Sequence, residues 1–387
     1  MKLFKSLLVA PATLGLLAPL SATANEINLV DVTGYSSSEE VTSISEFNPA
    51  KEIAVTNSRV DGLESRLNNF EAGSFSSTTS ASFGADFVIG AVDGEAAGKE
   101  ATTFNYQYGM NLSTSFTGED SLALTIETGN SSGSGASGIL DMNAMSDKMT
   151  LDGISYTFPL GDKTTVLVGD STDVSALYST ACSYSAFTDL LSNCGSGTAA
   201  GLGGGGTTTI SSATAAAAYD LGNGFTVAGG LSGSGGSDAG LFTKESMDVY
   251  GVQAAYNTDS YGVSLSYALT DTSATAETTF WGLNAFYSFE GEGLPSISVG
   301  YETEDPSAGV TEEGYFVGLT WPEVGAGSFS IGMSSTENFK DTDTEYYQYE
   351  AAYSYPINDG MTITPGVFIK EGTTDQTGIL VKTSFSF

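Results

Sequence analysis

Apolar and polar residues alternate one by one over much of the chain. Residues 104–116, FNYQYGMNLSTSF, place aromatic and aliphatic side chains on one side of an extended strand and Asn, Gln and Ser on the other. The same two-sided pattern recurs at 347–355 and at 361–370. Side chains of a β-strand point alternately to opposite faces of the sheet. The pattern therefore predicts an all-β protein whose strands have one apolar and one polar face.

Sixteen segments of the chain fit this pattern. They are residues 79–90, 102–117, 120–128, 149–159, 163–170, 207–220, 223–233, 246–257, 260–270, 276–289, 294–302, 314–322, 327–335, 345–356, 360–370 and 377–387. An even number of antiparallel strands is typical of bacterial outer-membrane barrels.

The connections distinguish a barrel from a soluble β-sandwich, which would also alternate. Tight turns such as 117–120 (TGED) and 356–360 (PINDG) alternate along the chain with longer polar connections such as 129–148. Short turns at one end and long loops at the other are a feature of outer-membrane barrels. Beyond the N-terminal region there is no run of about 18 apolar residues, so a membrane-embedded chain has to be a closed barrel. We therefore expect residues 73–387 to form a sixteen-stranded antiparallel transmembrane β-barrel.

Aromatic residues crowd the ends of the strands beside the tight turns. These residues are Tyr219, Phe225, Tyr256, Tyr261, Tyr287, Trp321, Tyr353 and Tyr355. Such rings favour the membrane–water interface, so the sequence predicts an aromatic girdle there, with packing inside the strand ends as the alternative. The last strand ends on Phe387 in this same girdle. A terminal Phe is typical of bacterial outer-membrane barrels and predicts a signal for the barrel insertion machinery.

The first 72 residues break the alternation and predict two other segments. Residues 1–24 have two lysines, an apolar run and the small residues Ala22, Thr23 and Ala24, the pattern of a signal peptide cleaved before Asn25. Residues 25–72 then form a periplasmic segment. Within it, 52–70 has apolar residues at helical spacing. This short helix is either a trimeric coiled coil or a monomeric helix lying on the barrel.

Composition excludes several classes of function. The chain has 46 acidic and 12 basic residues and a formal charge of −34, which argues against a nucleic-acid partner because phosphate backbones are met by Lys and Arg. It has no histidine, which excludes Ser-His proteases, His-dependent phospholipases and His-ligated zinc enzymes. We expect neither an enzyme nor a bound cofactor.

The longest connection, 171–206, contains the only two cysteines. Cys182 and Cys194 lie close together in an exported chain, so a local disulfide is expected. A connection of this length is unusual unless it has a function. We predict that it folds into the lumen as a constriction, with Asp170, Asp173 and Asp189 as its charge filter. The alternative is a flap outside the barrel.

The polar face of the strands predicts the wall of a water-filled channel, because a sixteen-stranded barrel is wide enough to hold one. The predicted lumen-lining residues are Asp86, Asn105, Gln107, Asn111, Glu127, Gln253, Asn284, Gln348, Glu350, Lys370 and Lys382. No arginine lies in the barrel, and only Lys370 and Lys382 are lysines at wall positions, which disfavours a dedicated anion channel. The acidic loops indicate either an enriched cation concentration at the mouth or a solvated surface bridged by divalent ions.

One stretch resembles a known family. The run AVTNSRVDGLESRLNNFEAGSFSSTT (54–79), the following FVIGAVDG, the early GYSSSEEVTSISEF (34–47) and the terminal Phe387 resemble cyanobacterial outer-membrane porins of the OprB-like, carbohydrate-selective or iron uptake class. Family members usually carry an S-layer homology domain between such segments. Here only residues 48–51 stand there, so the resemblance gives no support for cell-wall tethering.

The sequence as a whole predicts a passive porin for small hydrophilic solutes and inorganic ions. The resemblance adds iron and small carbohydrates as expected solutes. Expected partners are the lipid bilayer, outer-leaflet lipopolysaccharide, the insertion machinery and two further copies in a homotrimer. The alternatives are a secreted acidic β-rich surface protein or adhesin, and an outer-membrane barrel plugged by its long loop.

Overall fold

The computed structural model describes residues 78–95, 100–194, 213–234, 240, 243, 246–273, 276–291, 293–307, 309–335 and 345–387. They belong to the second of two compact units, which starts at Asn69. The predicted signal peptide, the periplasmic segment 25–72 and its helix lie outside the described residues. The same holds for residues 195–212, which comprise the last part of the longest connection and the first residues of the strand predicted at 207–220.

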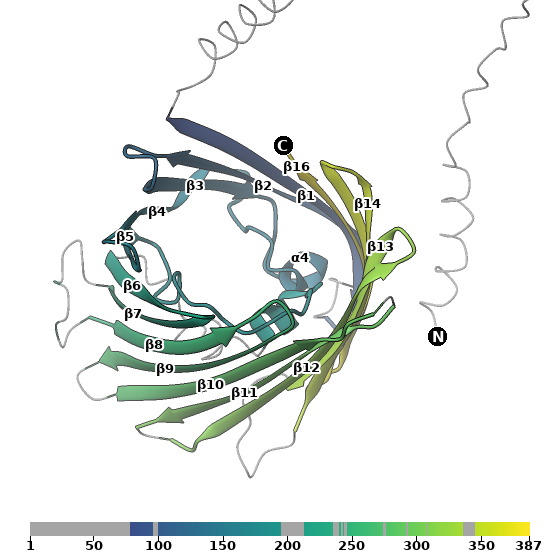
Figure 1. The fold of residues 1–387 in the computed structure, drawn as a ribbon. Helices are drawn as coiled ribbons and strands as arrows, with labels where there is room; N and C mark the ends of the chain where they lie inside the picture. The colour runs from purple at the N-terminus through teal and green to yellow at the C-terminus, as the bar shows by residue number, and fades with distance from the viewer. Residues whose placement is uncertain are drawn as a thin grey trace, which may run out of the picture. The chain divides into compact units, whose positions relative to one another are not determined.

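Sixteen antiparallel strands close into one barrel, which confirms the predicted fold class (Figure 1). The strands are β1 (Thr79–Asp93), β2 (Thr103–Thr114), β3 (Ser121–Gly129), β4 (Thr150–Pro159), β5 (Thr164–Asp170), β6 (Ala213–Gly222), β7 (Phe225–Gly233), β8 (Asp248–Asn257), β9 (Tyr261–Ser273), β10 (Ala276–Ser288), β11 (Ser296–Pro306), β12 (Glu312–Val324), β13 (Gly327–Ser335), β14 (Tyr347–Asn358), β15 (Met361–Lys370) and β16 (Gln376–Ser386). Each strand pairs with its neighbours in sequence, and β1 closes the ring against β16.

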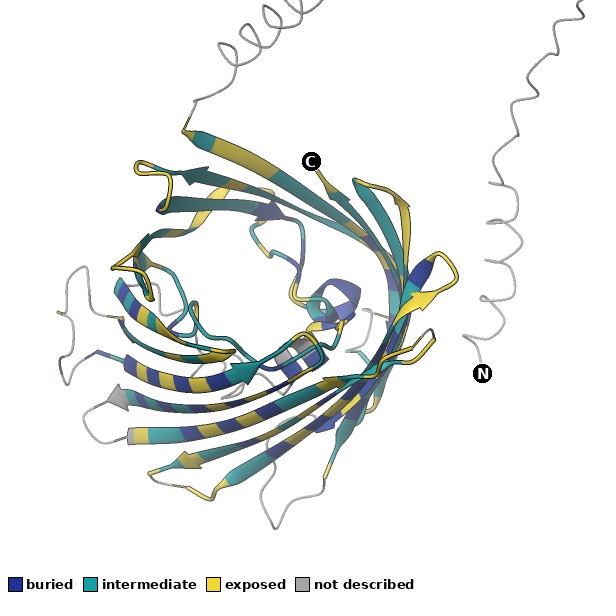
Figure 2. Ribbon diagram, viewed as in Figure 1, coloured by how far each residue is buried: buried dark blue, intermediate teal, exposed yellow. Residues whose placement is uncertain are grey.

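The alternation seen in the sequence becomes an inner and an outer face. On β8, Gln253 is 4% exposed, whereas its neighbour Val252 is 55% exposed. Figure 2 shows the result as stripes of buried and exposed residues along β8 and β9. The apolar side chains stand on the outer face, where a membrane protein meets lipid, and the polar ones point inward.

The tight turns have the residues that their geometry requires. Between β6 and β7, Asn223 and Gly224 both have positive φ, at 55° and 87°. Asn and Gly tolerate this left-handed region best, which allows the two-residue reversal. Between β2 and β3, the carboxylate of Asp120 accepts hydrogen bonds from the backbone N–H groups of Phe116 and Thr117, at 2.9 and 2.8 Å. The side chain of Asp120 thus closes this turn.

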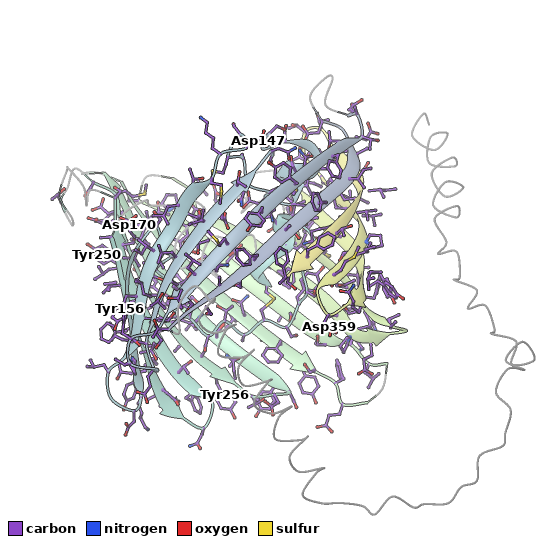
Figure 3. All side chains as sticks on the ribbon, turned by 90° about the horizontal axis from the view of Figure 1, so that it is seen from above. Asp147, Tyr156, Asp170, Tyr250, Tyr256 and Asp359 are labelled. Atoms are coloured by element: carbon purple, nitrogen blue, oxygen red, sulfur yellow. A yellow bond between two sulfur atoms is a disulfide. The ribbon has the colours of Figure 1, made fainter. Side chains whose placement is uncertain are left out.

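Aromatic side chains pack against one another near the tight turns. The ring centroids of Phe225 and Tyr256 are 4.4 Å apart, and those of Tyr287 and Phe289 are 4.9 Å apart. Figure 3 shows Tyr156 and Tyr256 at the opposite end of the barrel from Asp147. The terminal Phe387 exchanges two backbone hydrogen bonds with Phe83 on β1. This contact fixes the C-terminal end of the ring.

Two connections on the loop side fold inward. One contains helix α4 (Gly135–Ile139), and the described part of the other ends with the 3₁₀ helix η3 (Asp189–Cys194). Figure 1 shows α4 inside the ring of strands. Among the described residues, no helix is both long and apolar enough to span a bilayer.

Candidate functional site

The lumen is covered on one side and accessible on the other. Inward-facing side chains of β8 to β14 are almost completely buried: Gln253 (4% exposed), Ser264 (1%), Asn284 (0%), Ser298 (1%), Gln348 (2%) and Glu350 (3%). On β2, by contrast, the inward-facing Asn105 is half-buried and Asn111 is exposed. Solvent therefore reaches the inner face of β2, while another part of the chain covers the wall opposite.

That covering segment is residues 171–194, called here the inward loop. Every second residue of its middle part donates a backbone hydrogen bond to an inward side chain of the wall. The bonds run from Ser179 to Gln253 Oε1 (2.7 Å), from Ala181 to Ser264 Oγ (3.0 Å), from Ser183 to Ser298 Oγ (3.0 Å) and from Ser185 to Thr320 Oγ1 (3.1 Å). The loop is therefore an extended chain laid across β8, β9, β11 and β12, with its N–H groups satisfied by wall side chains.

Glu350 on β14 holds the next part of the inward loop. Its Oε1 accepts hydrogen bonds from Tyr184 Oη (2.7 Å) and from the N–H of Phe187 (2.8 Å). Its Oε2 accepts from the N–H and the hydroxyl of Thr188, at 2.8 and 2.5 Å. Among the described residues, no lysine or arginine forms an ion pair with this carboxylate. A buried charge is tolerated here because four donors replace its water shell.

The wall makes room for the loop with glycines. A Cβ on Gly318 or Gly332 would clash with the ring of Tyr184, and a Cβ on Gly366 would clash with Phe187. These three glycines lie on β12, β13 and β15 and face inward. They form a recess in which the two aromatic rings are seated. Burial of the ring, followed by the charge of Glu350, raises the pKa of Tyr184, so its hydroxyl stays a donor.

The far end of the loop is tied back in two ways. Cys182 and Cys194 form a disulfide across a sequence separation of 12 residues. The side chain of Asn284 donates to the carbonyl of Cys194 (2.9 Å), and that of Gln348 donates to the carbonyl of Leu190 (2.5 Å). The segment from 182 to 194 is thus a closed ring pressed against β10 to β14.

The connection 130–149 supplies a second inward element. Ala136 and Ile139 of α4 pack with Met142 in a hydrophobic cluster inside the barrel. The wall contributes Val88 and Val92 of β1, Ala352 of β14, Phe368 of β15 and Leu380 of β16, and the inward loop contributes Phe187. This cluster explains the apolar residues on the inner face of β1, β15 and β16. It joins both inward connections to the same part of the wall.

Two pairs of carboxylates remain close to the lumen. Burial, reinforced by the charge of Asp189, raises the pKa of Asp141. Burial, reinforced by the charge of Asp152, raises the pKa of Asp173. The first pair joins the two inward connections, and the second lies near the end of β5. Both pairs give the lumen a negative charge that would favour cations.

Of the three acids predicted to form the constriction, two lie in the inward loop and one lies on strand β5. Asp173 is half-buried and Asp189 is exposed, both within the inward loop. Asp170 is on the same side of β5 as Val168, which is 44% exposed on the outer face. The register therefore does not place Asp170 in a charge filter, because the strand has not yet ended at that residue. The predicted return segment 201–206 lies outside the described residues.

The predicted wall residues all face inward, but they divide into two groups. Asp86 accepts a hydrogen bond from Gln107 (2.7 Å), and Asn111 accepts one from Thr125 (2.9 Å), on the accessible side of the lumen. Four more predicted wall residues are half-buried: Asn105, Glu127, Lys370 and Lys382. Four others are covered, so their prediction as channel lining is wrong in this respect: Gln253, Asn284, Gln348 and Glu350. They anchor the inward loop instead of contacting solute.

The sequence does not predict several residues that hold the inward connections in place. Tyr184, Phe187 and Thr188 seat the loop, and Asp141 pairs with Asp189. The stretch YSAFTDLL (184–191) contains one signal: apolar and aromatic residues are unusual in a connection that faces only water. Nothing in the sequence links Asp141 to the loop, because their proximity arises only from the closed barrel.

Comparison with known proteins identifies the fold. No family model and no curated protein matches the chain. Among solved structures, a mutant of the Rhodobacter blastica porin is 15% identical, with 80% of this chain and 100% of that chain covered and a TM-score of 0.56. Pseudomonas putida OprB at high pH is 11% identical, with 80% and 94% covered and a TM-score of 0.58.

The chain has the fold of a porin. At these identities the comparison shows the architecture and leaves residue roles to the geometry of this chain. In this chain the inward loop and α4 lie inside the barrel, against its inner wall.

Proposed function

We propose that this protein is a passive outer-membrane porin that lets small hydrophilic solutes and inorganic ions diffuse across the membrane. The observation that supports this most is the contrast between the two sides of the lumen. The inner faces of β2 and β3 are polar and accessible, with Asn111 hydrogen-bonded to Thr125 (2.9 Å). A water-filled path beside a covered wall suits a diffusion channel and has no need of bond chemistry.

The inward loop serves as the constriction in this proposal. Its seating by Glu350 and its closure by Cys182 and Cys194 support a fixed narrowing rather than an external flap. The carboxylates of Asp141 and Asp189 give this narrowing a weak preference for cations. Iron and small carbohydrates, which the resemblance implies, remain candidate solutes.

We also propose that the protein is a homotrimer with its tight turns, N-terminal segment and C-terminus in the periplasm. Phe387 serves the insertion machinery, and the acidic loop side faces lipopolysaccharide.

The outer face has an apolar recess of about 630 Å³ lined by small residues of β6 and β7, including Ala215, Ala217 and Gly229. Such a recess would admit a neighbouring barrel closely. Cross-linking in detergent followed by mass measurement would test the trimer.

A plugged structural barrel is the second candidate function. The hydrophobic cluster of α4, Phe187 and Phe368 inside the barrel favours it, because it fills part of the lumen. Swelling of liposomes in neutral sugars of graded size separates the two candidates. A porin gives swelling rates that fall with solute size, whereas a plugged barrel gives none even though it inserts as a folded barrel.

A further inference from the structure

A cavity of about 250 Å³ lies inside the barrel, between the inward loop and the tight turns. Its lining is Ser185, Ala186 and Phe187 of the loop and Ser328, Ser330, Ala352, Ser354, Thr362, Thr364, Lys382 and Ser384 of the wall. The wall residues come from four neighbouring strands, β13 to β16, and all are on the inward side of their strands. The cavity is therefore part of the solute path of the proposed porin.

The chemistry of this lining differs from that of the rest of the lumen. It contains seven hydroxyl side chains, one ammonium group and no carboxylate. Lys382 is in register with Thr364, and Ser384 is in register with Thr362, so the ammonium group and three hydroxyls share one small area of wall. Elsewhere the described lumen presents pairs of acids, such as Asp141 with Asp189.

The donors in the cavity are available to a ligand. Among the described residues, Lys382 forms no ion pair or hydrogen bond, and the hydroxyls of Thr362 and Thr364 have no protein partner. The acid on the neighbouring strand is Asp86, which is in register with Ser384 and accepts a 2.7 Å hydrogen bond from Gln107. Lys382 is therefore available to a ligand in the cavity, and Asp86 lies on the neighbouring strand β1 outside the lining.

Charge and size restrict what can bind. A cation would meet the ammonium group, whereas a neutral polyol would use the hydroxyls but gain nothing from the charge. An oxyanion accepts hydrogen bonds from both and is also attracted to Lys382. The volume of about 250 Å³ is below the range of roughly 300–1,000 Å³ that encloses a drug-sized ligand. It suits a small hydrated ion better than an oligosaccharide.

We propose that this cavity is a binding subsite for a small oxyanion of the phosphate type, held by Lys382 and the hydroxyls of Thr362, Thr364 and Ser384. This subsite would bind anions within a lumen whose other charged residues, the carboxylates, repel them. Binding is weak, with a dissociation constant in roughly the millimolar range, because a single ammonium group that is only half-buried contributes little. The role of the subsite in transport rests on the proposed porin function. Binding of the oxyanion itself does not.

Phosphorus NMR of inorganic phosphate with the refolded barrel in a phosphate-free detergent tests the subsite directly. Wild-type protein should broaden the phosphate resonance in a saturable way. Lys382→Gln should weaken the binding about five-fold, the factor that corresponds to one exposed charge pair. Lys382→Arg should retain it. Lys370→Gln is the matched control, because it removes the other wall lysine without touching the cavity.

Equal broadening by wild type and Lys382→Gln would overturn the proposal, as would no broadening by wild type. Loss of binding in Lys370→Gln to the same extent would also overturn it, since it would indicate only a general charge effect. Heat-modifiable gel migration establishes that each variant is a folded barrel. The measurement needs no ion flow, so a protein that binds phosphate but fails to swell liposomes would contradict the porin and leave the subsite intact.

Discussion

The carboxylate of Glu350 on β14 accepts a 2.7 Å hydrogen bond from the hydroxyl of Tyr184, 166 residues earlier in the chain. The same carboxylate accepts three more bonds from Phe187 and Thr188. One wall side chain therefore satisfies four donors of the inward loop. Because Glu350 is 3% exposed, water cannot replace these bonds while the loop is seated.

Glu350→Gln should release the inward loop from the wall. The amide nitrogen would face donors, so at least one hydrogen bond to a charged acceptor is lost, each of which stabilises by about 1.5–3 kcal/mol. We expect a larger or noisier single-channel conductance in planar bilayers, because the loop is then free to leave its seat. The substitution also removes one negative charge from the wall.

Asp86→Asn controls for that charge. Asp86 faces the lumen, and it accepts a hydrogen bond from Gln107 rather than from the loop. It should lower the cation preference slightly and leave the conductance noise unchanged. If Asp86→Asn and Glu350→Gln behave alike, Glu350 does not hold the constriction.

The prediction of Glu350 as a wall residue illustrates what the sequence can and cannot give. Alternation identified the inward side of β14 correctly, because the period of two is a local property of the strand. Whether water or another segment covers that side depends on a contact with residues 184–188. No local pattern records such a long-range contact, so alternation alone predicts Glu350 as channel lining.

Opening the disulfide should loosen the same loop from its other end. Cys182→Ser with Cys194→Ser removes a crosslink over 12 residues, and closing a loop of about that size contributes roughly 3 kcal/mol in chain-entropy terms. We expect a changed conductance and ion selectivity, reproduced in wild type by a reductant. Unchanged conductance and selectivity would argue against the constriction role.

When the pH is lowered, the cation preference should begin to fall at a higher pH than it would if Asp141 titrated like an ordinary aspartate. Burial and the charge of Asp189 raise the pKa of Asp141 above the usual value of about 3.9. As the pH is lowered, Asp141 is therefore neutralised at a higher pH than an ordinary aspartate, and negative charge beside the inward loop is lost. Reversal potentials in a salt gradient, measured against pH, should show this step.

Asp141→Asn should remove that step while retaining a preference from Asp173 and Asp189. Burial and Asp152 also raise the pKa of Asp173, so the double variant with Asp173→Asn should have the flattest profile. An identical pH profile in wild type and both variants would contradict the assignment of these carboxylates to the lumen.

The turn between β2 and β3 should be stabilised by Asp120 in a pH-dependent way. Hydrogen bonds, first from Tyr156 (2.7 Å) and then from the backbone of Thr117, lower the pKa of Asp120. A depressed folded-state pKa adds stability above the unfolded value of about 3.9, which is lost as the pH falls towards the folded value. Asp120→Asn should unfold at a lower temperature near neutral pH, and the difference should shrink in acid.

Glu119→Gln is the control for this turn. Its side chain is exposed and forms no hydrogen bond within the described part of the chain. It should unfold like wild type in heat-modifiable gel migration. A destabilisation equal to that of Asp120→Asn would mean that charge alone, rather than the hydrogen bonds of Asp120, stabilises the turn.

The strands could be predicted closely because periodicity and turn residues are local. The segment predicted at 276–289 is β10, Ala276–Ser288, and the tight turn at 356–360 separates β14 from β15. Helix α4 was not predicted, because GASGI contains two glycines and has low helix propensity. It is helical because burial of Ala136 and Ile139 inside the barrel stabilises it, which is a tertiary effect.

The central claim is that an open, water-filled path runs beside the seated loop. Single-channel recording of the purified, folded protein in planar bilayers tests it most directly. The account predicts discrete conductance steps in potassium chloride with a weak cation preference. A barrel that is shown to be folded and inserted but gives no conductance steps would contradict it.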